Sequence, residues 1–572
     1  MTLRLNTIRW VAIFLGLTFS LGAEPTATTA EQRLADQTAT LQTQPHNAGL
    51  WDARGHTRLE LHDTVGAAAD FSEAIHLAPS NVGYRLSRAQ LLTHQNNWPG
   101  VIADCAKGLS VNPEYVELLL LRARARTNLD QPKEALADAN KAIALSPDNS
   151  EARSLRAWIH FLRKDWSSAN DDATQALKAK PDQIDLLLVS GIAHRELKQP
   201  AEARECFTHI LKLDTNHLRA LFNLGQLDLA SHDWSGAAEL FTHALRLSPG
   251  QPEALAGLGQ ALLELGDAKG AAEALSQVVT FRPNQPEPFL LRARAAEQLG
   301  LFEHAFNDAS QAVVLGSNDP EARLIIARAS EKQGAWDAVI QQCNRVLKVS
   351  PNNTEALRLI AHALLARGET ESGLNAFGLA ITTQPDNWRL TLERASALQR
   401  LKRFDDAIKD CSRTIELNPQ ATYAIALRAY CHLQKDEFNE ALADCEKAIA
   451  LEPQQTLPLL VRARVLLNRN EAAKAEVDCT AALKLAPDSA WGFSTLAMVL
   501  VRQGRHEEAV TAASNALQIA PNDTESLVTR GRAHLALHHY KLAARDIDRA
   551  IELNSNLKDS LKPELTNLEN HR

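Results

Sequence analysis

Small apolar residues recur along the chain at two fixed places in a period of 34 residues. When the period is numbered so that its recurrent proline is position 32, position 8 is Gly or Ala in all fifteen copies between residues 48 and 557. Position 20 is Ala in twelve of the fifteen. Small side chains at fixed places are needed where two helices cross closely. The pattern therefore predicts a pair of tightly packed helices in every copy.

A proline ends most copies of this period, and no insertion or deletion interrupts the series. Because proline cannot continue a helix, each copy is expected to consist of a helix, a short turn, a second helix and a break. Residues 48–557 are thus predicted to form thirty stacked helices without a strand. The prolines in this register are Pro45, Pro79, Pro113, Pro147, Pro181, Pro249, Pro283, Pro351, Pro385, Pro419, Pro453, Pro487 and Pro521.

The second half of each copy carries a recognisable sequence. Residues 134–147 are Glu-Ala-Leu-Ala-Asp-Ala-Asn-Lys-Ala-Ile-Ala-Leu-Ser-Pro, and residues 440–453 are Glu-Ala-Leu-Ala-Asp-Cys-Glu-Lys-Ala-Ile-Ala-Leu-Glu-Pro. Both strongly resemble the second helix of the tetratricopeptide repeat, whose period is also 34 residues. The resemblance covers about nine tenths of the chain. It implies an all-α fold, a right-handed superhelical solenoid of helix-turn-helix repeats.

The resemblance also implies where a partner would bind. In this family the first helices line the concave face of the superhelix, which holds an extended peptide or a helix of another protein. The chain departs from the family pattern at position 11, where Tyr is expected and no copy has one; Arg58, His160 and Leu262 stand there instead. This departure counts against an aromatic-lined groove at that position.

The two ends of the chain differ from the repeats. Arg4 and Arg9 precede an apolar run from Trp10 to Leu21, and this pattern predicts a signal peptide at residues 1–23. A retained membrane anchor is the alternative, but the run is short of the roughly 20 residues that span a bilayer. After cleavage no membrane span is expected, and the protein would be secreted, periplasmic or extracellular. Residues 24–47 are predicted to be a linker and an N-terminal capping helix, and residues 558–572 a C-terminal cap.

Composition and charge add little to this picture. A net charge of -8, from 61 basic and 69 acidic residues, gives no general attraction to nucleic acid. We find no phosphate-binding loop or nucleophile motif, so no enzyme activity and no cofactor are expected. His534, His538 and His539 are the closest group of histidines, but no third and fourth ligand follows at zinc-site spacing. No metal site is predicted.

Five of the seven cysteines occupy position 24, where other repeats carry Phe, Leu, Ile or Ala. They are interpreted as core residues, and a ladder of disulfides between neighbouring repeats would exceed bridging distance. Cys431, at position 10, is the exception, because its helix is expected to face the helix that carries Cys445. A bridge between these two cysteines and a pair of free thiols both remain open.

Position 9 is biased toward basic residues and is acidic in no repeat. The guanidinium group is suited to binding carboxylates and phosphates, so a row of arginines along the first helices is a candidate ligand-facing surface. Alternatively, these arginines pair with acids one repeat away, since position 2 is acidic in eight repeats. The arginines are Arg124, Arg294, Arg328, Arg464 and Arg532.

Positions 7 and 23 vary together. The nine repeats with Arg at position 7 are the same nine that have Asp at position 23, sixteen residues later, and paired change of this kind implies contact. Pairing each Asp with the following repeat fails, because Asp172 would then meet Ser190. We therefore predict ion pairs inside each repeat, including Arg428 with Asp444 and Arg462 with Asp478. The arginines are Arg54, Arg88, Arg122, Arg156, Arg292, Arg394, Arg428, Arg462 and Arg530.

Two functions fit these observations. The first is an exported, non-enzymatic scaffold that binds other proteins, as peptide or helix, in the concave groove. The alternative is a structural or assembly subunit of a cell-envelope or polysaccharide-export complex. Reversible capture of soluble partners would favour the scaffold, whereas co-purification in one fixed complex would favour the subunit.

Overall fold

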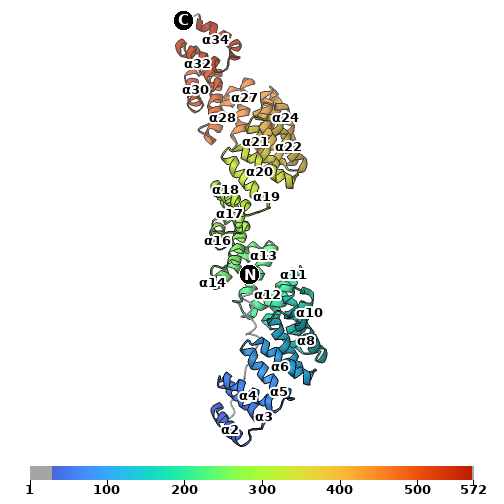
Figure 1. The fold of residues 1–572 in the computed structure, drawn as a ribbon. Helices are drawn as coiled ribbons and strands as arrows, with labels where there is room; N and C mark the ends of the chain where they lie inside the picture. The colour runs from blue at the N-terminus through green and yellow to red at the C-terminus, as the bar shows by residue number, and fades with distance from the viewer. Residues whose placement is uncertain (1–28, 570–572) are drawn as a thin grey trace. The chain divides into compact units, whose positions relative to one another are not determined.

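A computed structural model describes residues 29–569, and every regular element in this range is a helix. The described residues divide into two compact units, with the boundary between Pro283 and Asn284, and each unit is described by itself. The first contains seven helix pairs and the second contains eight, and the helices follow one another in chain order (Figure 1). The expected all-α solenoid of helix pairs is confirmed, and residues 48–557 hold the thirty predicted helices.

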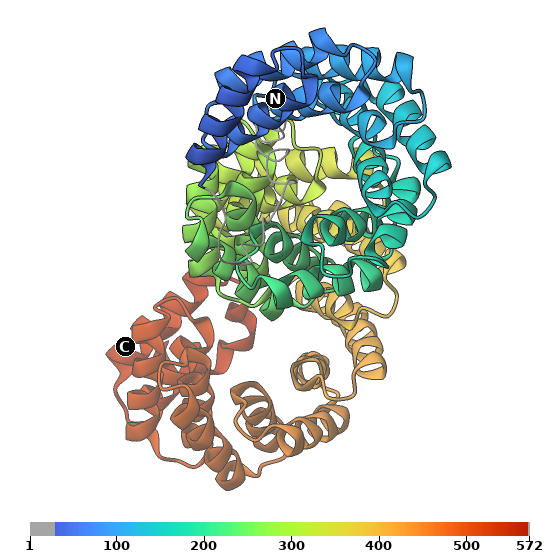
Figure 2. The same cartoon turned by 90° about the horizontal axis from the view of Figure 1, so that it is seen from below.

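In the first unit, each repeat pairs a helix of 13 residues with one of 12 or 14. Figure 2 shows that the helices from α3 to α12, blue to teal, follow a curved path. The first helices of the repeats are α3 (Ala48–Glu60), α5 (Val82–His94), α7 (Val116–Asn128), α9 (Ser150–Leu162), α11 (Ile184–Glu196), α13 (Leu218–Ala230) and α15 (Pro252–Glu264). The second helices are α4 (Thr64–Leu77), α6 (Trp98–Val111), α8 (Pro132–Leu145), α10 (Trp166–Leu177), α12 (Pro200–Leu213), α14 (Trp234–Leu247) and α16 (Ala268–Phe281).

The second unit repeats the same arrangement. Its first helices are α17 (Pro286–Gln298), α19 (Pro320–Lys332), α21 (Thr354–Ala366), α23 (Trp388–Arg400), α25 (Thr422–Gln434), α27 (Thr456–Asn468), α29 (Ala490–Arg502) and α31 (Thr524–Ala536). Its second helices are α18 (Phe302–Val314), α20 (Trp336–Val349), α22 (Thr370–Thr383), α24 (Phe404–Leu417), α26 (Phe438–Leu451), α28 (Ala472–Leu485), α30 (His506–Ile519) and α32 (Tyr540–Leu553).

The turn inside each repeat has the same backbone geometry throughout. Position 15, two residues after the last residue of the first helix, has a positive φ in all fifteen repeats, between 56° and 84°. Glycine occupies this position in only five repeats, and Asn, Asp, His or Lys occupies it in the others, for example Asn96 and Lys198. A residue in this conformation ends a helix and lets the chain reverse. The direction of the second helix is therefore set locally.

The core of each repeat is built on a size match between position 8 and position 24, which face each other across the two helices. Where position 8 is glycine, position 24 on the facing helix is Phe, Leu or Ile; where position 24 is Cys or Ala, position 8 is Ala. A Cβ atom added at Gly225 would lie 2.9 Å from Phe241 Cζ, and one added at Gly55 would lie 2.6 Å from Phe71 Cε1. Only Ala361 opposite Phe377 departs from this match.

Short helices cover the ends of the repeat series. Helix α2 (Ala30–Thr43) packs against α3, and its N-terminus is closed by a capping box between Thr29 and Gln32. Helices α33 (Leu557–Ser560) and α34 (Lys562–Glu569) bury Leu561 and Leu568 against α32. The predicted signal peptide, residues 1–23, lies outside the described residues. Within them, no helix is both long and apolar enough to cross a membrane.

The alternative of a bridge between Cys431 and Cys445 is not borne out. All seven cysteines are free, and these two belong to different parts of the core. Cys431 packs with Leu398 and Ala407 of the preceding repeat, whereas Cys445 packs with residues of its own repeat and the next one. The side chain of Cys431, at position 10, therefore contacts the preceding repeat and not Cys445, at position 24 of its own repeat.

Candidate partner-binding face

The first helices of repeats 1 to 4 surround a cavity of about 550 Å³. Every residue that lines it comes from α3, α5, α7 or α9. Its apolar part is formed by Leu59, Leu86, Leu120 and Leu121, and its polar part includes Gln90, which is exposed. Ligand pockets typically combine an apolar lining with a few polar groups, and this cavity has that composition.

The arginines at position 9 lie on first helices in both units, and at least four of them hold a carboxylate of the chain itself. Arg124 lies 3.3 Å from Glu151, at position 2 of the next repeat, and Arg532 lies 2.7 Å from Glu564 in the C-terminal cap. Arg328 and Arg464 hold acids at closer range, as described below, and Arg294 occupies the same position on α17. These four arginines are thus paired with acids of the chain, some of them one repeat away, which was the alternative to a ligand-facing row.

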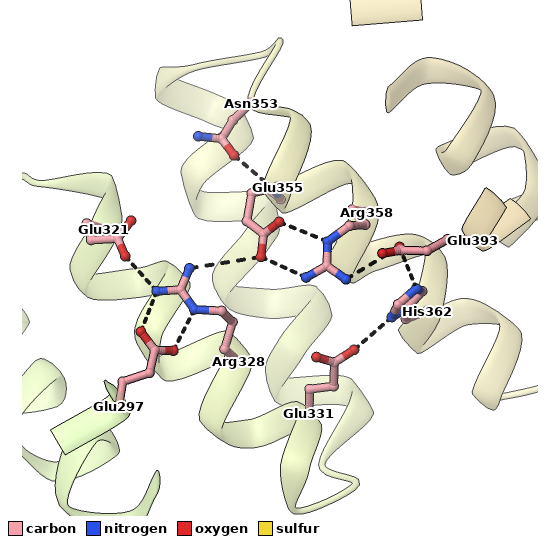
Figure 3. A network of polar contacts seen from close by, with 10 residues as sticks. Glu297, Glu321, Arg328, Glu331, Asn353, Glu355, Arg358, His362 and Glu393 are labelled. Atoms are coloured by element: carbon pink, nitrogen blue, oxygen red, sulfur yellow. Dashed lines mark hydrogen bonds and ion pairs between the residues drawn. The ribbon is translucent and has the colours of Figure 1, made fainter. Parts of the chain in front are cut away.

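A polar network crosses four first helices of the second unit (Figure 3). Arg328 on α19 donates two hydrogen bonds to Glu297 on α17, at 2.6 and 2.8 Å, and also contacts Glu321 at 2.5 Å. Arg358 on α21 donates two to Glu355, at 2.8 and 2.9 Å. These side chains are between 21% and 37% exposed, and their ion pairs raise the pKa of Arg328 and Arg358 against the effect of burial.

His362 completes this network by joining three helices. Its Nδ1 lies 2.9 Å from Glu331 on α19, and its Nε2 lies 3.1 Å from Glu393 on α23. Burial disfavours the charged imidazole, but the hydrogen bonds to these two carboxylates outweigh burial and raise the pKa of His362 to about 9. The same bonds lower the pKa of Glu331 and, against burial, that of Glu393. His362 is therefore protonated at neutral pH.

The stability of the second unit should depend on the charge of His362. Because the folded-state pKa lies above that of the unfolded chain, the contribution of His362 is complete below about pH 6.5 and is lost as the pH rises toward about 9. We expect the difference in urea midpoint between wild type and His362→Gln to shrink over this range. Arg358, the other cation beside Glu393, stays charged over this range, so its ion pair does not contribute to the change with pH. A constant difference from pH 6 to 9.5, about the range that spans both pKa values, would contradict this.

Arg464 makes the most extended contact of the position 9 arginines. It donates to Glu525, two repeats further on, at 2.7 Å, and its Nε donates to Thr495 at 3.1 Å. Its guanidinium also stacks over Trp491 at 5.2 Å, and the Trp491 ring meets Tyr430 edge-on at 5.9 Å. The chain's own side chains thus occupy this part of the face in repeats 12 to 15.

The sequence pattern indicated the acids at position 2, but not the acids at positions 6 and 12 that also take part in these contacts. Glu297, Glu331 and Glu393 lie at positions 12, 12 and 6, and each is 31 residues from its partner at position 9. Thr495 lies 31 residues from Arg464 as well. A search for opposite charges at this spacing, rather than at the repeat length, would have found the ion pairs.

The predicted pairs of positions 7 and 23 are brought together in all nine repeats. Arg428 Nε and Nη2 each donate to Asp444 at 2.7 Å, and Arg462 donates to Asp478 at 2.7 and 2.8 Å. Arg428 Nη1 also donates to Ser412, on the second helix of the preceding repeat, at 2.9 Å. The arginine therefore joins three helices. The bond to Asp444 raises the pKa of Arg428 despite its burial.

The three C-terminal histidines are arranged without a ligand set around them. His534 is buried, and burial lowers its pKa, while His538 Nδ1 lies 3.0 Å from the Tyr540 hydroxyl. The rings of His534 and His539 are 5.6 Å apart. Between residues 29 and 569 no group of three or more His, Cys, Asp or Glu side chains is placed to hold a metal ion.

Models of the tetratricopeptide repeat match five segments of the chain. They are residues 120–184, 228–295, 358–422, 423–455 and 460–524. Together these segments make up more than half of the 572 residues. No curated protein matches the chain in sequence.

Among solved structures, the chain is similar to the APC/C hetero-tetramer Cut9-Hcn1, with 14% identity, a TM-score of 0.38, and coverage of 84% of this chain and 94% of that one. Yeast Tom70 is 18% identical with a TM-score of 0.34, over 75% of this chain and 97% of Tom70. YrrB, described as a TPR protein with an unusual peptide-binding site, is 21% identical with a TM-score of 0.30, over 32% and 95%.

Proposed function

The chain belongs to the tetratricopeptide-repeat family, and from this premise we propose that it is an exported, non-enzymatic scaffold that holds protein partners against its first helices. One observation carries the proposal: the cavity of repeats 1 to 4 is lined only by first helices and combines leucines with exposed polar groups. Such a surface suits a peptide or helix that inserts apolar side chains between polar contacts.

Export is supported by the sequence of residues 1–23. Fusing these residues to a reporter that is active only outside the cytoplasm should give activity, and replacing the apolar run from Trp10 to Leu21 with polar residues should abolish it. Equal activity of the two fusions would contradict export and leave the binding face unaffected.

Filling the cavity should block partner binding. We expect Gln90→Trp to reduce the partner retained from an envelope extract by about tenfold or more, because the indole occupies space that an anchoring side chain would need. The matched control is Val65→Trp, at a side chain on α4 that is 80% exposed and does not line the cavity. Both variants should melt like the wild type.

Retention that is equal in the two variants would remove the cavity from the binding face. Arg328→Gln is a poorer test, because it leaves Glu297 and Glu321 without their cation and should weaken the fold as well. Recovery of one complex of constant composition would instead favour an assembly subunit.

A further inference from the structure

A second cavity, of about 510 Å³, lies on the first helices α21, α23 and α25 of the second unit. Its charged and aromatic lining residues are His362, Trp388, Arg389, Glu393, Arg400 and Tyr423. It adjoins the polar network of Figure 3 through His362 and Glu393.

Positive charge prevails in this cavity. Glu393 is the only carboxylate among its lining residues, and it is already bonded to His362 at 3.1 Å and lies 3.5 Å from Arg358. Arg389 stacks over Trp388 at 5.3 Å. Within residues 29–569, neither Arg389 nor Arg400 forms an ion pair, and both are exposed. Two guanidinium groups therefore face the cavity without a carboxylate.

The place of Arg389 in its helix is unfavourable for the fold. It lies at position 2, in the first turn of α23, where eight other repeats have Asp or Glu. The positive end of the helix dipole favours an acid there and disfavours a cation. The backbone N–H of Arg389 is already capped by the Asn387 side chain, so the arginine does not serve to close the helix. Neither helix capping nor the helix dipole therefore accounts for an arginine at this place.

Two aromatic residues beside the arginines indicate that the ligand also has an apolar part. Tyr423 is 50% exposed, and with Trp388 it borders the cavity. Leu392 forms an apolar part of the lining. A flat, partly apolar border beside two guanidinium groups fits a polypeptide with carboxylates next to an aromatic or aliphatic side chain.

We propose that the cavity between α21, α23 and α25 binds an acidic segment of a partner protein, whose carboxylates pair with Arg389 and Arg400 while a neighbouring apolar side chain packs against Trp388 and Tyr423. This deepens the proposed function and rests on it. The residues that would bind the carboxylates are therefore Arg389 at position 2 and Arg400 at position 13 of their repeat, and not the arginines at position 9.

The test uses the full chain and two fluorescein-labelled pentapeptides, Glu-Asp-Phe-Glu-Asp and its neutral counterpart Gln-Asn-Phe-Gln-Asn, in an anisotropy titration. We expect the wild type to bind the acidic peptide about tenfold or more tightly than the neutral one, with an affinity that falls as salt is added. R389Q/R400Q should lose this preference. R413Q/R549Q removes the same charge from half-exposed arginines on second helices of the same unit and should retain it.

Equal binding of the two peptides by the wild type, or an acidic preference that survives in R389Q/R400Q, would overturn the proposal. Tighter binding of a single-stranded oligonucleotide than of the acidic peptide would overturn the assignment to a protein. Because R389Q relieves the unfavourable helix dipole, unchanged or higher melting temperatures exclude unfolding as the cause of lost binding. If the wild type captures an envelope partner but shows no acidic preference, this inference alone fails. If the wild type captures no partner at all, the proposed function fails.

Discussion

Replacing Asp444 by leucine is expected to destabilise the second unit by about 3 kcal/mol, at the lower end of the range for breaking a buried ion pair. The Asp444 side chain is 10% exposed and that of Arg428 is 23% exposed, so the arginine would keep some water but lose both of its bonds to the carboxylate. Hydrogen exchange of α25 and α26 across a urea series would localise the loss.

Adding Arg428→Leu to this variant should restore more than half of the loss. Four repeats already have apolar residues in both places, and they fold in the same way: Leu224 with Leu240, Leu258 with Ala274, Ile360 with Ala376 and Leu496 with Ala512. The double variant also loses the bond from Arg428 to Ser412, and Ser412→Ala alone, at a cost of about 1 kcal/mol or less, is the control for that term. A double variant no more stable than Asp444→Leu would show that the pair is not the source of the loss.

Phe241→Ala should cost about 4 kcal/mol in the first unit, because a fully buried ring is removed between Gly225 and Gly257. Gly225→Ala alone should also destabilise, by about 1–3 kcal/mol, since its Cβ would lie 2.9 Å from the ring. In the Phe241→Ala background the sign should reverse. The three nearest atoms to that Cβ all belong to Phe241, so without the ring Gly225→Ala should gain up to about 1 kcal/mol in helix propensity.

Denaturant midpoints of the four proteins in this cycle give the coupling directly. Repeat 3 already has the small pair, Ala123 with Ala139, and Ala123→Gly there serves as the matched control, with an expected cost of about 1 kcal/mol. If Gly225→Ala destabilises equally in both backgrounds, the size match between positions 8 and 24 does not determine the packing.

Much of the fold could be predicted because each repeat contacts mainly its neighbours. An exact period places all thirty helices, and the covariation of Arg428 with Asp444 and of Arg462 with Asp478 indicates a contact within one repeat. The prediction fails where it depends on the direction of a side chain. Cys431 was expected to face Cys445, but it packs against the preceding repeat.

The binding face shows the same division. The sequence indicated that arginines at position 9 lie on the first helices, but not which of them hold a carboxylate. Arg328 meets Glu297, 31 residues before it, and Arg464 reaches Glu525, 61 residues after it. Neither separation in sequence equals the repeat length of 34 residues. Side chains that meet on neighbouring first helices occupy different positions of the repeat, and a long side chain such as that of Arg464 extends past the nearest helix.

The sequence by itself thus determined the repeat, the helix pairs and the ion pairs inside them, since these depend on local propensity and on contacts that recur with the period. The tertiary structure decided which charges on the first helices are already paired and which, such as Arg389 and Arg400, are not. Superhelical packing sets the separation of side chains from different repeats. Whether a given arginine meets a carboxylate therefore depends on three-dimensional distances that no single repeat contains.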